Sequence, residues 1–325
     1  LRIYDTVLGA LARALPAEIP AASGGQGCMV ALALPDLEAG RRHVTVIEPM
    51  IGGGGGRPGR DGIDGCDASL GFLKTTPAET LEAEVPAVLV RRFHLIADSA
   101  GPGRWRGGHA VRLDLQVLRP EGQVTARGME RLRFAPWGVA GGRAGATGSA
   151  VLNPETPGER PVPKIDLLAL EPGDVLSMRT PGGGGNGDPL ERPVEAVAAD
   201  VAAGLVTPAH ARAAYGVVMT AGAVDLAATR ALRAGGRAAS GPPGAFDFGG
   251  ARDAHERRWP PALQDALVAL LMTLPAPYRA YVRRALYARI TARADREPVR
   301  PEDLAGLWAE LAASVGLSPR AGEHP

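Results

Sequence analysis

The pattern of apolar and polar positions predicts one helix at the start of the chain and strands after it. Apolar residues recur at helical spacing before Pro16, at Leu1, Tyr4, Leu8, Leu11 and Leu15. Short apolar or alternating stretches bounded by turn residues predict strands. These stretches are Cys28–Leu34, His43–Pro49, Ala87–Ile96, Ala110–Leu118, Val124–Met129, Pro161–Leu170 and Asp174–Thr180. The chain up to residue 180 is therefore expected to be rich in β-structure.

The pattern becomes helical after the last of these strands. Glu191–Ala203 predicts a helix that Gly204 closes. Thr207 and Pro208 supply an N-cap and a first-turn proline, which predicts the start of a second helix. Gly216–Met219 predicts one further short strand.

The composition changes beyond residue 223 and indicates a separate C-terminal part. A stretch rich in Gly, Ala and Pro predicts a linker over residues 224–250. Helical spacing follows at Pro261–Leu274, Pro277–Arg293 and Pro301–Val315. We therefore expect an α+β protein. Its β-rich main domain with glycine-rich loops covers residues 1–223, and a small helical C-terminal region covers residues 251–325.

Composition and charge narrow the classes of function. The 325 residues include 44 Gly and 29 Pro, and the apolar stretches between them indicate a folded chain with many tight turns. A net charge of +1 and 4% aromatic residues do not indicate a nucleic acid or a membrane as partner. The sequence shows no signal peptide and no membrane span of about 20 apolar residues. Cys28 and Cys66 are expected to be unrelated reduced thiols of a cytoplasmic protein.

Three glycine-rich segments dominate the sequence. They are Ile51–Arg57 with Asp61-Gly62, Asp98–Gly108 and Thr180–Pro189. Glycine permits left-handed backbone and close backbone approach, and a run of free N–H groups can bind an anion. The segments therefore predict either turn-forming linkers or a ligand cradle. None has the spacing of a P-loop or of a dinucleotide-binding turn.

Charged residues in and beside these segments are the candidate binding residues. A guanidinium suits a carboxylate, a phosphate or an amide carbonyl, but it also pairs with a local aspartate and holds a loop. We expect Asp98 to hold Arg104 or Arg106, with Arg104 structural and Arg106 facing a ligand or a subunit. The residues predicted to bind substrate or to shape a site are Arg57, Asp61, Asp98, Arg104, Arg106, Asn186 and Asp188.

The sequence assigns no catalytic residue and no metal ligand. The six histidines lack metal-ligand spacing, and His94 and His109, which bracket the second glycine-rich segment, are expected to be core residues. Ser99 does not lie in a nucleophile elbow, and neither cysteine has the local signature of a nucleophile.

The order of several motifs resembles the hydantoinase B/oxoprolinase family over roughly residues 1–220. The similar segments are Gly52–Gly62, Thr76–Glu82 with Pro86, Asp98–Gly108, Thr180–Pro189 with Arg192, and Asp200-Val201 with Tyr215–Val218. The resemblance implies the C-terminal part of a B-type subunit of an ATP-dependent enzyme that opens a small cyclic amide of the hydantoin or 5-oxoproline kind. It also implies a hetero-oligomer with an A-type subunit that binds ATP and Mg²⁺ and phosphorylates the carbonyl oxygen of the substrate.

The sequence departs from the family pattern in one respect. The family's Asn-Asp-Pro and His-x-x-Asp metal-ligand stretch, which precedes these motifs, is missing, and the residues at 71–75 lack the expected asparagine. We therefore expect either a fragment or a split subunit, in which any divalent metal is held upstream, or a subunit that has lost the metal chemistry, and in each case we expect this segment alone to be inactive. The alternatives are a subunit of an acetone- or acetophenone-type carboxylase and a non-catalytic scaffold.

Overall fold

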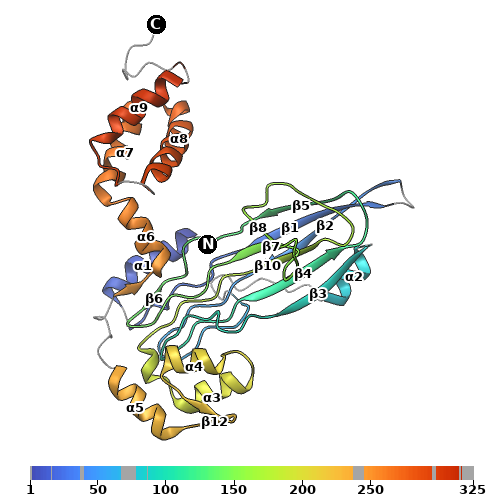
Figure 1. The fold of residues 1–325 in the computed structure, drawn as a ribbon, viewed down its shortest axis with the longest axis vertical. Coiled ribbons are helices and arrows are strands. Elements are labelled where there is room, and N and C mark those ends of the chain that lie inside the picture. Colours follow the sequence, from blue (N-terminus) through green and yellow to red (C-terminus); the bar gives the residue numbers. More distant parts are fainter. Residues whose placement is uncertain are drawn as a thin grey trace. The chain divides into compact units, whose positions relative to one another are not determined.

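The chain folds into two compact units, Leu1–Gly249 and Gly250–Pro325. The computed structural model describes residues 2–15, 17–36, 40–66, 78–85, 87–236, 245–294, 298–314 and 316. The first unit combines helices with antiparallel sheets, which confirms the predicted α+β class (Figure 1).

Two antiparallel sheets share one hydrophobic core in the first unit. The four-stranded sheet has the order β2 (Arg41–Met50), β1 (Cys28–Asp36), β5 (Gly122–Arg127), β9 (Leu168–Leu170). The five-stranded sheet has the order β3 (Val88–Leu95), β4 (Val111–Val117), β10 (Val175–Arg179), β7 (Ser149–Leu152), β8 (Arg160–Val162). Apolar residues at every second position of β1, β4 and β10 point into this core, since side chains alternate between the faces of a strand. Helix α2 (Ala78–Glu84) adds Leu81.

The prediction of one strand over Pro161–Leu170 is wrong. The segment contains β8 and β9, which lie in different sheets. Pro163 separates them and has no N–H for a ladder hydrogen bond, and the chain crosses the core at the buried Ile165. The family motif at Thr76–Glu82 is described only from Ala78 onward; residues 67–77 and Pro86 lie outside the described residues.

The glycine-rich segments lie side by side as extended chain beyond one end of the sheets (Figure 1). We call residues 21–24, 53–56, 99–108, 137–146 and 182–187 the glycine bundle. Successive residues of its last segment bond to different neighbours. The N–H of Gly183 donates to Gly108 O (2.9 Å), that of Gly184 to Ala22 O (2.7 Å), and that of Gly185 to Arg143 O (2.9 Å). The segment is therefore surrounded by backbone on several sides, unlike a strand, which has neighbours only within its sheet.

Close packing of backbone against backbone explains why these positions are glycine. A Cβ on Gly182, Gly183, Gly184 or Gly185 would overlap a carbonyl oxygen of a neighbouring segment. None of these four residues has the left-handed backbone that a glycine turn requires. The prediction of turn-forming linkers is therefore wrong for this run. The prediction of close backbone approach is right, but the partner is another segment of the same chain.

A small helical cluster follows the bundle. It contains the 3₁₀ turn η1 (Pro189–Glu191), α3 (Val194–Ala202) and α4 (Pro208–Tyr215). As predicted, Thr207 caps α4 by accepting a hydrogen bond from the backbone N–H of His210. The hairpin of β11 (Met219–Thr220) and β12 (Ala223–Val224) packs on the same cluster.

The first unit also includes part of the predicted linker. Helix α5 (Leu226–Gly236) lies in the 224–250 stretch, and β13 (Phe246–Asp247) pairs with β6 (Gly138–Val139). Residues 237–244 of that stretch lie outside the described residues. Near the start of the sequence, α1 (Arg2–Ala14) packs against Trp137. Gly9 lies beside the ring of Trp137, and Ala12 belongs to the same hydrophobic cluster.

The second unit is helical, as the predicted C-terminal region requires. Its helices in the described ranges are α6 (Gly250–Arg258), α7 (Pro261–Thr273), α8 (Ala276–Ala294) and α9 (Asp303–Ser314). They enclose their own core, which includes Trp259, Leu263, Leu286 and Trp308. Among the described helices of both units, none combines the length and the apolar character that crossing a membrane requires.

Candidate functional site

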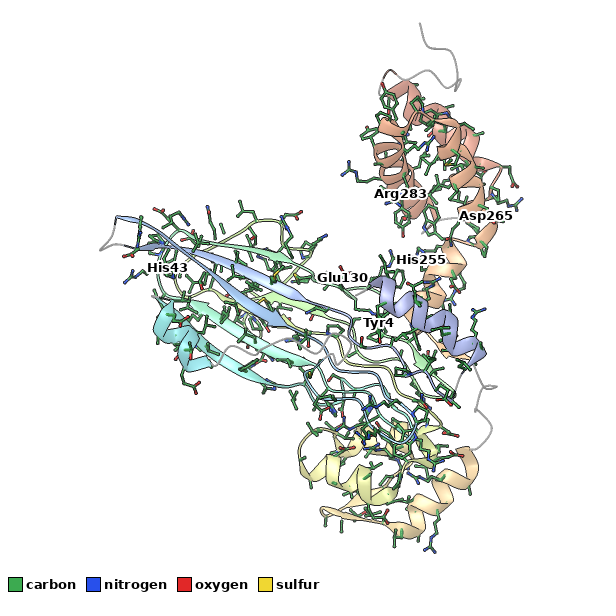
Figure 2. The ribbon with its side chains drawn as sticks, turned by 180° about the vertical axis from the view of Figure 1, so that it is seen from behind. Tyr4, His43, Glu130, His255, Asp265 and Arg283 are labelled. Carbon is green, nitrogen blue, oxygen red and sulfur yellow. The ribbon has the colours of Figure 1, made fainter. Side chains whose placement is uncertain are left out.

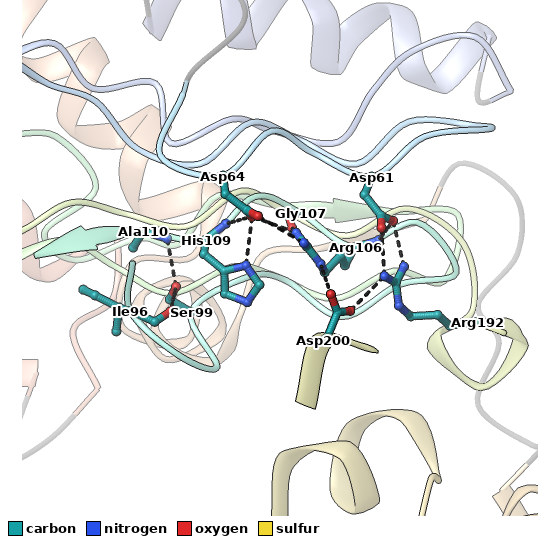
Figure 3. A network of polar contacts seen from close by, with 10 residues as sticks. All are labelled: Asp61, Asp64, Ile96, Ser99, Arg106, Gly107, His109, Ala110, Arg192 and Asp200. Carbon is teal, nitrogen blue, oxygen red and sulfur yellow. Dashed lines mark hydrogen bonds and ion pairs between the residues drawn. The ribbon is translucent and has the colours of Figure 1, made fainter. Parts of the chain in front are cut away.

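A chain of buried ion pairs ties the glycine bundle to the helical cluster (Figure 3). Arg192, which precedes α3, donates to both carboxylate oxygens of Asp61 at 2.7 and 2.8 Å and to Asp200 of α3 at 2.9 Å. Asp200 also accepts from Nε of Arg106 at 3.3 Å. The guanidinium of Arg106 then reaches Asp64 at 2.8 and 3.1 Å. We call Asp61, Asp64, Arg106, Arg192 and Asp200 the Asp–Arg network.

Three residues of the network are nearly closed to solvent, while the side chains of Asp61 and Asp64 are 33% and 24% exposed. The exposed fractions are 6% for Arg106, 3% for Arg192 and 8% for Asp200. Charges buried to this degree are tolerated only when each has a partner of opposite sign and further hydrogen bonds. Two backbone N–H groups add such bonds, since Arg106 N donates to Asp61 (2.9 Å) and His109 N donates to Asp64 (2.8 Å).

Hydrogen bonding keeps the network ionised. Burial alone would raise the pKa of Asp64, but hydrogen bonds from His109 and Arg106 outweigh burial and hold this pKa well below its usual value. Burial would lower the pKa of Arg192, but hydrogen bonds to Asp61 outweigh it and raise this pKa above its usual value. Asp64 and Arg192 are therefore charged at neutral pH, and their ion pairs hold the connected segments together.

Asp64 also orients a buried histidine. Nδ1 of His109 lies 2.8 Å from Oδ1 of Asp64, and the His109 residue is 0% exposed. Its Nε2 is buried and has no hydrogen-bond partner among the described residues. The expectation of a core residue is confirmed for His109 and wrong for His94, which is exposed on β3. Ser99 is structural, because its Oγ donates to Ile96 O (2.6 Å) and accepts from Ala110 N (2.8 Å).

The expected pairing of Asp98 with Arg104 or Arg106 is wrong. Asp98 instead accepts hydrogen bonds from N and Oγ1 of Thr207, both at 2.8 Å. The reason is local geometry: Asp98 has a left-handed backbone (φ 60°) and lies beside the start of α4, whose N–H groups lack helical partners. The two arginines have other partners, Glu191 for Arg104 and the Asp–Arg network for Arg106.

The other predicted site residues are divided between two places. Asp61 joins Arg106 in the network, and Asp61 and Arg57 line a pocket against α1. Arg104, whose side chain is 52% exposed, lies over the ring of Trp105, which bridges Asn186 through its backbone. Asn186 is buried, and in the part of the chain that the structure describes its Nδ2 has no hydrogen-bond partner.

Two further findings complete the map of predicted residues. Asp188 caps η1 by accepting from Leu190 N at 2.8 Å. Cys28 and Cys66 are free thiols, as expected, and burial raises the pKa of Cys28 to about 11. Within the described ranges, no three histidine, cysteine or acidic side chains are grouped as ligands of one metal ion.

Asp64, Arg192 and Asp200 are members of the network that residue type and local spacing do not single out. Arg192 and Asp200 are eight positions apart, but the other side-chain contacts of the network join residues 42 to 131 positions apart, so no local spacing connects them. One signal was present: Asp61-Gly62-Ile63-Asp64-Gly65 repeats an Asp-Gly pair directly after the first glycine-rich segment.

The loss of the Asp98 contacts is expected to weaken the start of α4. Asp98→Ala removes two hydrogen bonds to Thr207 and places a non-glycine residue without a polar side chain in left-handed backbone. We expect a loss of about 1–2 kcal/mol in unfolding free energy, the usual range for a helix cap. Urea unfolding measures the loss, and Asp98→Asn is the matched control, since asparagine keeps an acceptor for Thr207 N and tolerates left-handed backbone. A loss below about 0.3 kcal/mol for Asp98→Ala would contradict this role.

The protein is of the α+β class. It combines antiparallel sheets, a glycine bundle that extends from them and an Asp–Arg network. Residues 1–189 match the family model described as hydantoinase B/oxoprolinase. The chain belongs to this family.

Individual relatives agree with that assignment. The chain is 36% identical to the beta subunit of the caprolactamase of Pseudomonas jessenii over 71% of this chain and 41% of the relative. It is 30% identical to the putative B subunit of the D-/L-hydantoinase of Pseudomonas sp. strain NS671 over 71% of this chain and 38% of the relative. The chain therefore spans about two fifths of the length of these two relatives.

Two solved structures have a similar fold. The ATP-dependent caprolactamase from Pseudomonas jessenii superposes with a TM-score of 0.57 at 32% identity, covering 69% of this chain and 40% of that one. A nucleotide-free acetone carboxylase superposes with a TM-score of 0.56 at 17% identity, covering 92% of this chain and 41% of that one. The second likeness concerns the fold alone.

Proposed function

We propose that the chain is part of the B-type subunit of an ATP-dependent enzyme that hydrolyses small cyclic amides. The observation that carries the proposal is the 36% identity, over 71% of this chain, to a subunit of a caprolactamase. The likeness to a putative hydantoinase subunit supports the same class, since both names refer to ring amides. The proposal includes a partner subunit, because both relatives are named as subunits.

The same proposal assigns ATP binding to a partner subunit. The described residues do not fit a triphosphate, because the glycine N–H groups that would cradle phosphates are already used. Those of Gly53, Gly54 and Gly56 donate to the carbonyl oxygens of Pro181, Ile63 and Gly184. We therefore place ATP and Mg²⁺ on an A-type partner.

We assign to this chain the role of holding the substrate in a site whose residues are rigid. The bundle is cross-linked by backbone hydrogen bonds, and Arg192 and Arg106 fix Asp61, which faces a pocket. A preorganised carboxylate of this kind orients a substrate without losing the free energy that ordering a mobile side chain would cost.

Reconstitution with an ATP-binding partner tests this function. The chain, joined to the remainder of its B-type subunit and co-expressed with an A-type subunit, is expected to open hydantoin, 5-oxoproline or caprolactam with release of ADP. Neither subunit alone is expected to do so, and omission of ATP is the control. Ring opening by the partner alone would show a scaffold instead. ADP release that requires bicarbonate and a ketone would show a carboxylase. Either result would overturn the proposal.

A further inference from the structure

A pocket lies between helix α1 and the glycine bundle. It is lined by Tyr4, Asp5, Leu8, Pro20, Ala21, Ser23, Gly54, Gly55, Arg57, Asp61, Gly62 and Ile63. Figure 2 shows Tyr4 on α1, beside the extended segments, while His43 lies at the distant end of β2. The pocket is therefore formed by the first 63 residues and lies apart from the sheets.

The size of the pocket limits its ligand to a small molecule. Its volume is about 120 Å³. A space of this size holds several waters or one small ring. Nucleotide and peptide ligands need larger sites, usually about 300–1,000 Å³. Leu8, Pro20 and Ile63 supply apolar surface for the body of a ring.

The charges of the pocket leave one cation available. Asp5 is 6% exposed and pairs with Arg131 at 2.9 Å, and Asp61 pairs with Arg192. Both carboxylates are thus neutralised by arginines that do not line the pocket. Arg57 does line it, and among the described residues no acidic side chain forms an ion pair with Arg57. A ligand group that accepts hydrogen bonds, such as a carbonyl oxygen, suits Arg57.

Asp61 offers the complementary acceptor. A carboxylate has about four lone-pair positions. Asp61 uses three of them, for Nη1 and Nη2 of Arg192 and for the backbone N of Arg106. One position remains for a ligand N–H. Asp61 and Arg57 therefore supply an acceptor and a donor to the same pocket, whose lining also includes the polar residues Tyr4, Asp5 and Ser23 and the apolar residues Leu8, Pro20 and Ile63.

We infer that this pocket binds a small ring amide, with the ligand N–H donated to Asp61 and the ligand C=O accepting from Arg57. A ring forces its amide bond to be cis, so N–H and C=O lie on the same edge of the molecule. An open-chain secondary amide prefers trans by about 2.5 kcal/mol and presents the two groups on opposite sides. The identity of the ligand class rests on the proposed function, whereas the position of the site rests on the pocket.

Titration of the full chain with caprolactam, followed by calorimetry and saturation-transfer NMR, tests the site. We expect saturable binding of caprolactam. N-Methylcaprolactam lacks the donor and is expected to bind about tenfold more weakly or worse, because Asp61 would lose a partner on burial. Absence of caprolactam binding, or equal binding of the two ligands, would overturn the inference.

Two pairs of variants locate the binding site. Leu8→Trp fills the pocket and is expected to abolish binding, whereas Val7→Trp, at a position of the same helix that is 52% exposed, is expected to retain it. Arg57→Met is expected to weaken binding about tenfold, and Arg60→Met, in the same turn but outside the pocket, is the control. The arginine pair keeps the test valid if Leu8→Trp lowers the melting temperature. Binding unchanged in both Leu8→Trp and Arg57→Met would place the ligand elsewhere.

The same variants separate this inference from the proposed function. If the reconstituted complex hydrolyses the ring and Leu8→Trp leaves its KM unchanged, the pocket is wrong and the function stands. If the chain binds caprolactam and Leu8→Trp abolishes binding, while the complex shows no ATP-dependent turnover, the function is wrong and the pocket stands.

Discussion

Replacing Gly183 by alanine is expected to prevent the first unit from folding. A Cβ at this position would overlap the carbonyl oxygen of Gly54 and crowd the backbone N of Gly108. These neighbours are backbone atoms, so no side chain can rotate away. Relief requires that the segments separate, and this breaks the hydrogen bonds Gly183 N–Gly108 O, Gly101 N–Gly183 O and Gly108 N–Gly54 O.

The expected cost is comparable with the whole stability of a domain. Each buried backbone group left unpaired costs about 1–3 kcal/mol, and three broken bonds leave six such groups. The net stability of a folded domain is about 5–15 kcal/mol. We therefore expect Gly183→Ala to yield no soluble protein, or protein without a cooperative melting transition of the first unit.

Circular dichroism melting and soluble yield measure this effect. Gly235→Ala is the matched control, because Gly235 lies in α5 with open space around its Cβ position and without left-handed backbone. Alanine there is expected to leave the melting temperature unchanged or to raise it slightly, since glycine is the poorer helix former by about 1 kcal/mol. A Gly183→Ala protein that melts like the unaltered chain would refute the close packing of the bundle.

The strands and most of the helices could be predicted from the sequence because their signals are local. Leu113, Leu115 and Val117 alternate with polar residues, and the alternation directs one face of β4 into the core. Thr207 and Pro208 mark the start of α4 by residue type alone. In both cases the residues that carry the signal are within one element, so the pattern is visible in a short window.

The glycine bundle could not be predicted from the same kind of signal. A glycine run indicates turns as readily as close packing, because the absence of a side chain serves both. What decides between them is the neighbour of each residue, such as Gly184 against Trp137 and Gly185 against Pro102. These contacts join distant parts of the chain. The contacts of Asp61 with Arg192 and of Asp98 with Thr207 were missed for the same reason, since each joins residues more than 100 positions apart.

Asp61 belongs both to the Asp–Arg network and to the lining of the pocket. Its carboxylate receives two bonds from Arg192 and one from the backbone of Arg106, and it also lines the pocket against α1. Arg192 is held in turn by Asp200 of α3. The helical cluster therefore fixes the orientation of a pocket residue that belongs to the first glycine-rich segment. This arrangement gives the Asp–Arg network a role at the site even though its arginines are buried.

Loss of Arg106 is expected to produce the second large effect. Arg106→Met keeps much of the buried volume but removes the cation between Asp64 and Asp200. Removal of one partner from a buried ion pair typically costs about 3–5 kcal/mol, because the remaining charge is left without compensation. We expect a loss of this size in the unfolding free energy of the first unit, measured by urea denaturation at pH 7.

Arg104→Met is the matched control for this loss. Arg104 is two positions away on the same segment, but its side chain is 52% exposed and its contact with Glu191 is 3.6 Å long. Exposed ion pairs contribute about 0–1 kcal/mol, so we expect a change within that range. Equal losses of unfolding free energy for the two variants would contradict the assignment of Arg106 as the buried cation between Asp64 and Asp200.

The loss of unfolding free energy caused by Arg106→Met is also expected to become smaller as the pH falls. In the unaltered chain the pKa of Asp64 is depressed, so its contribution to stability is complete above the unfolded value, about 3.9, and is lost as the pH falls through the lower folded value. In the variant the hydrogen bonds and the charge of Arg106 are gone, so the pKa of Asp64 is depressed less, by the His109 hydrogen bonds alone, and protonation at low pH relieves the buried charge. Acidification therefore costs the unaltered chain stability while it relieves the variant. The difference in unfolding free energy should be smaller at pH 4 than at pH 7, and a difference that grows on acidification would show that the network does not hold Asp64 ionised.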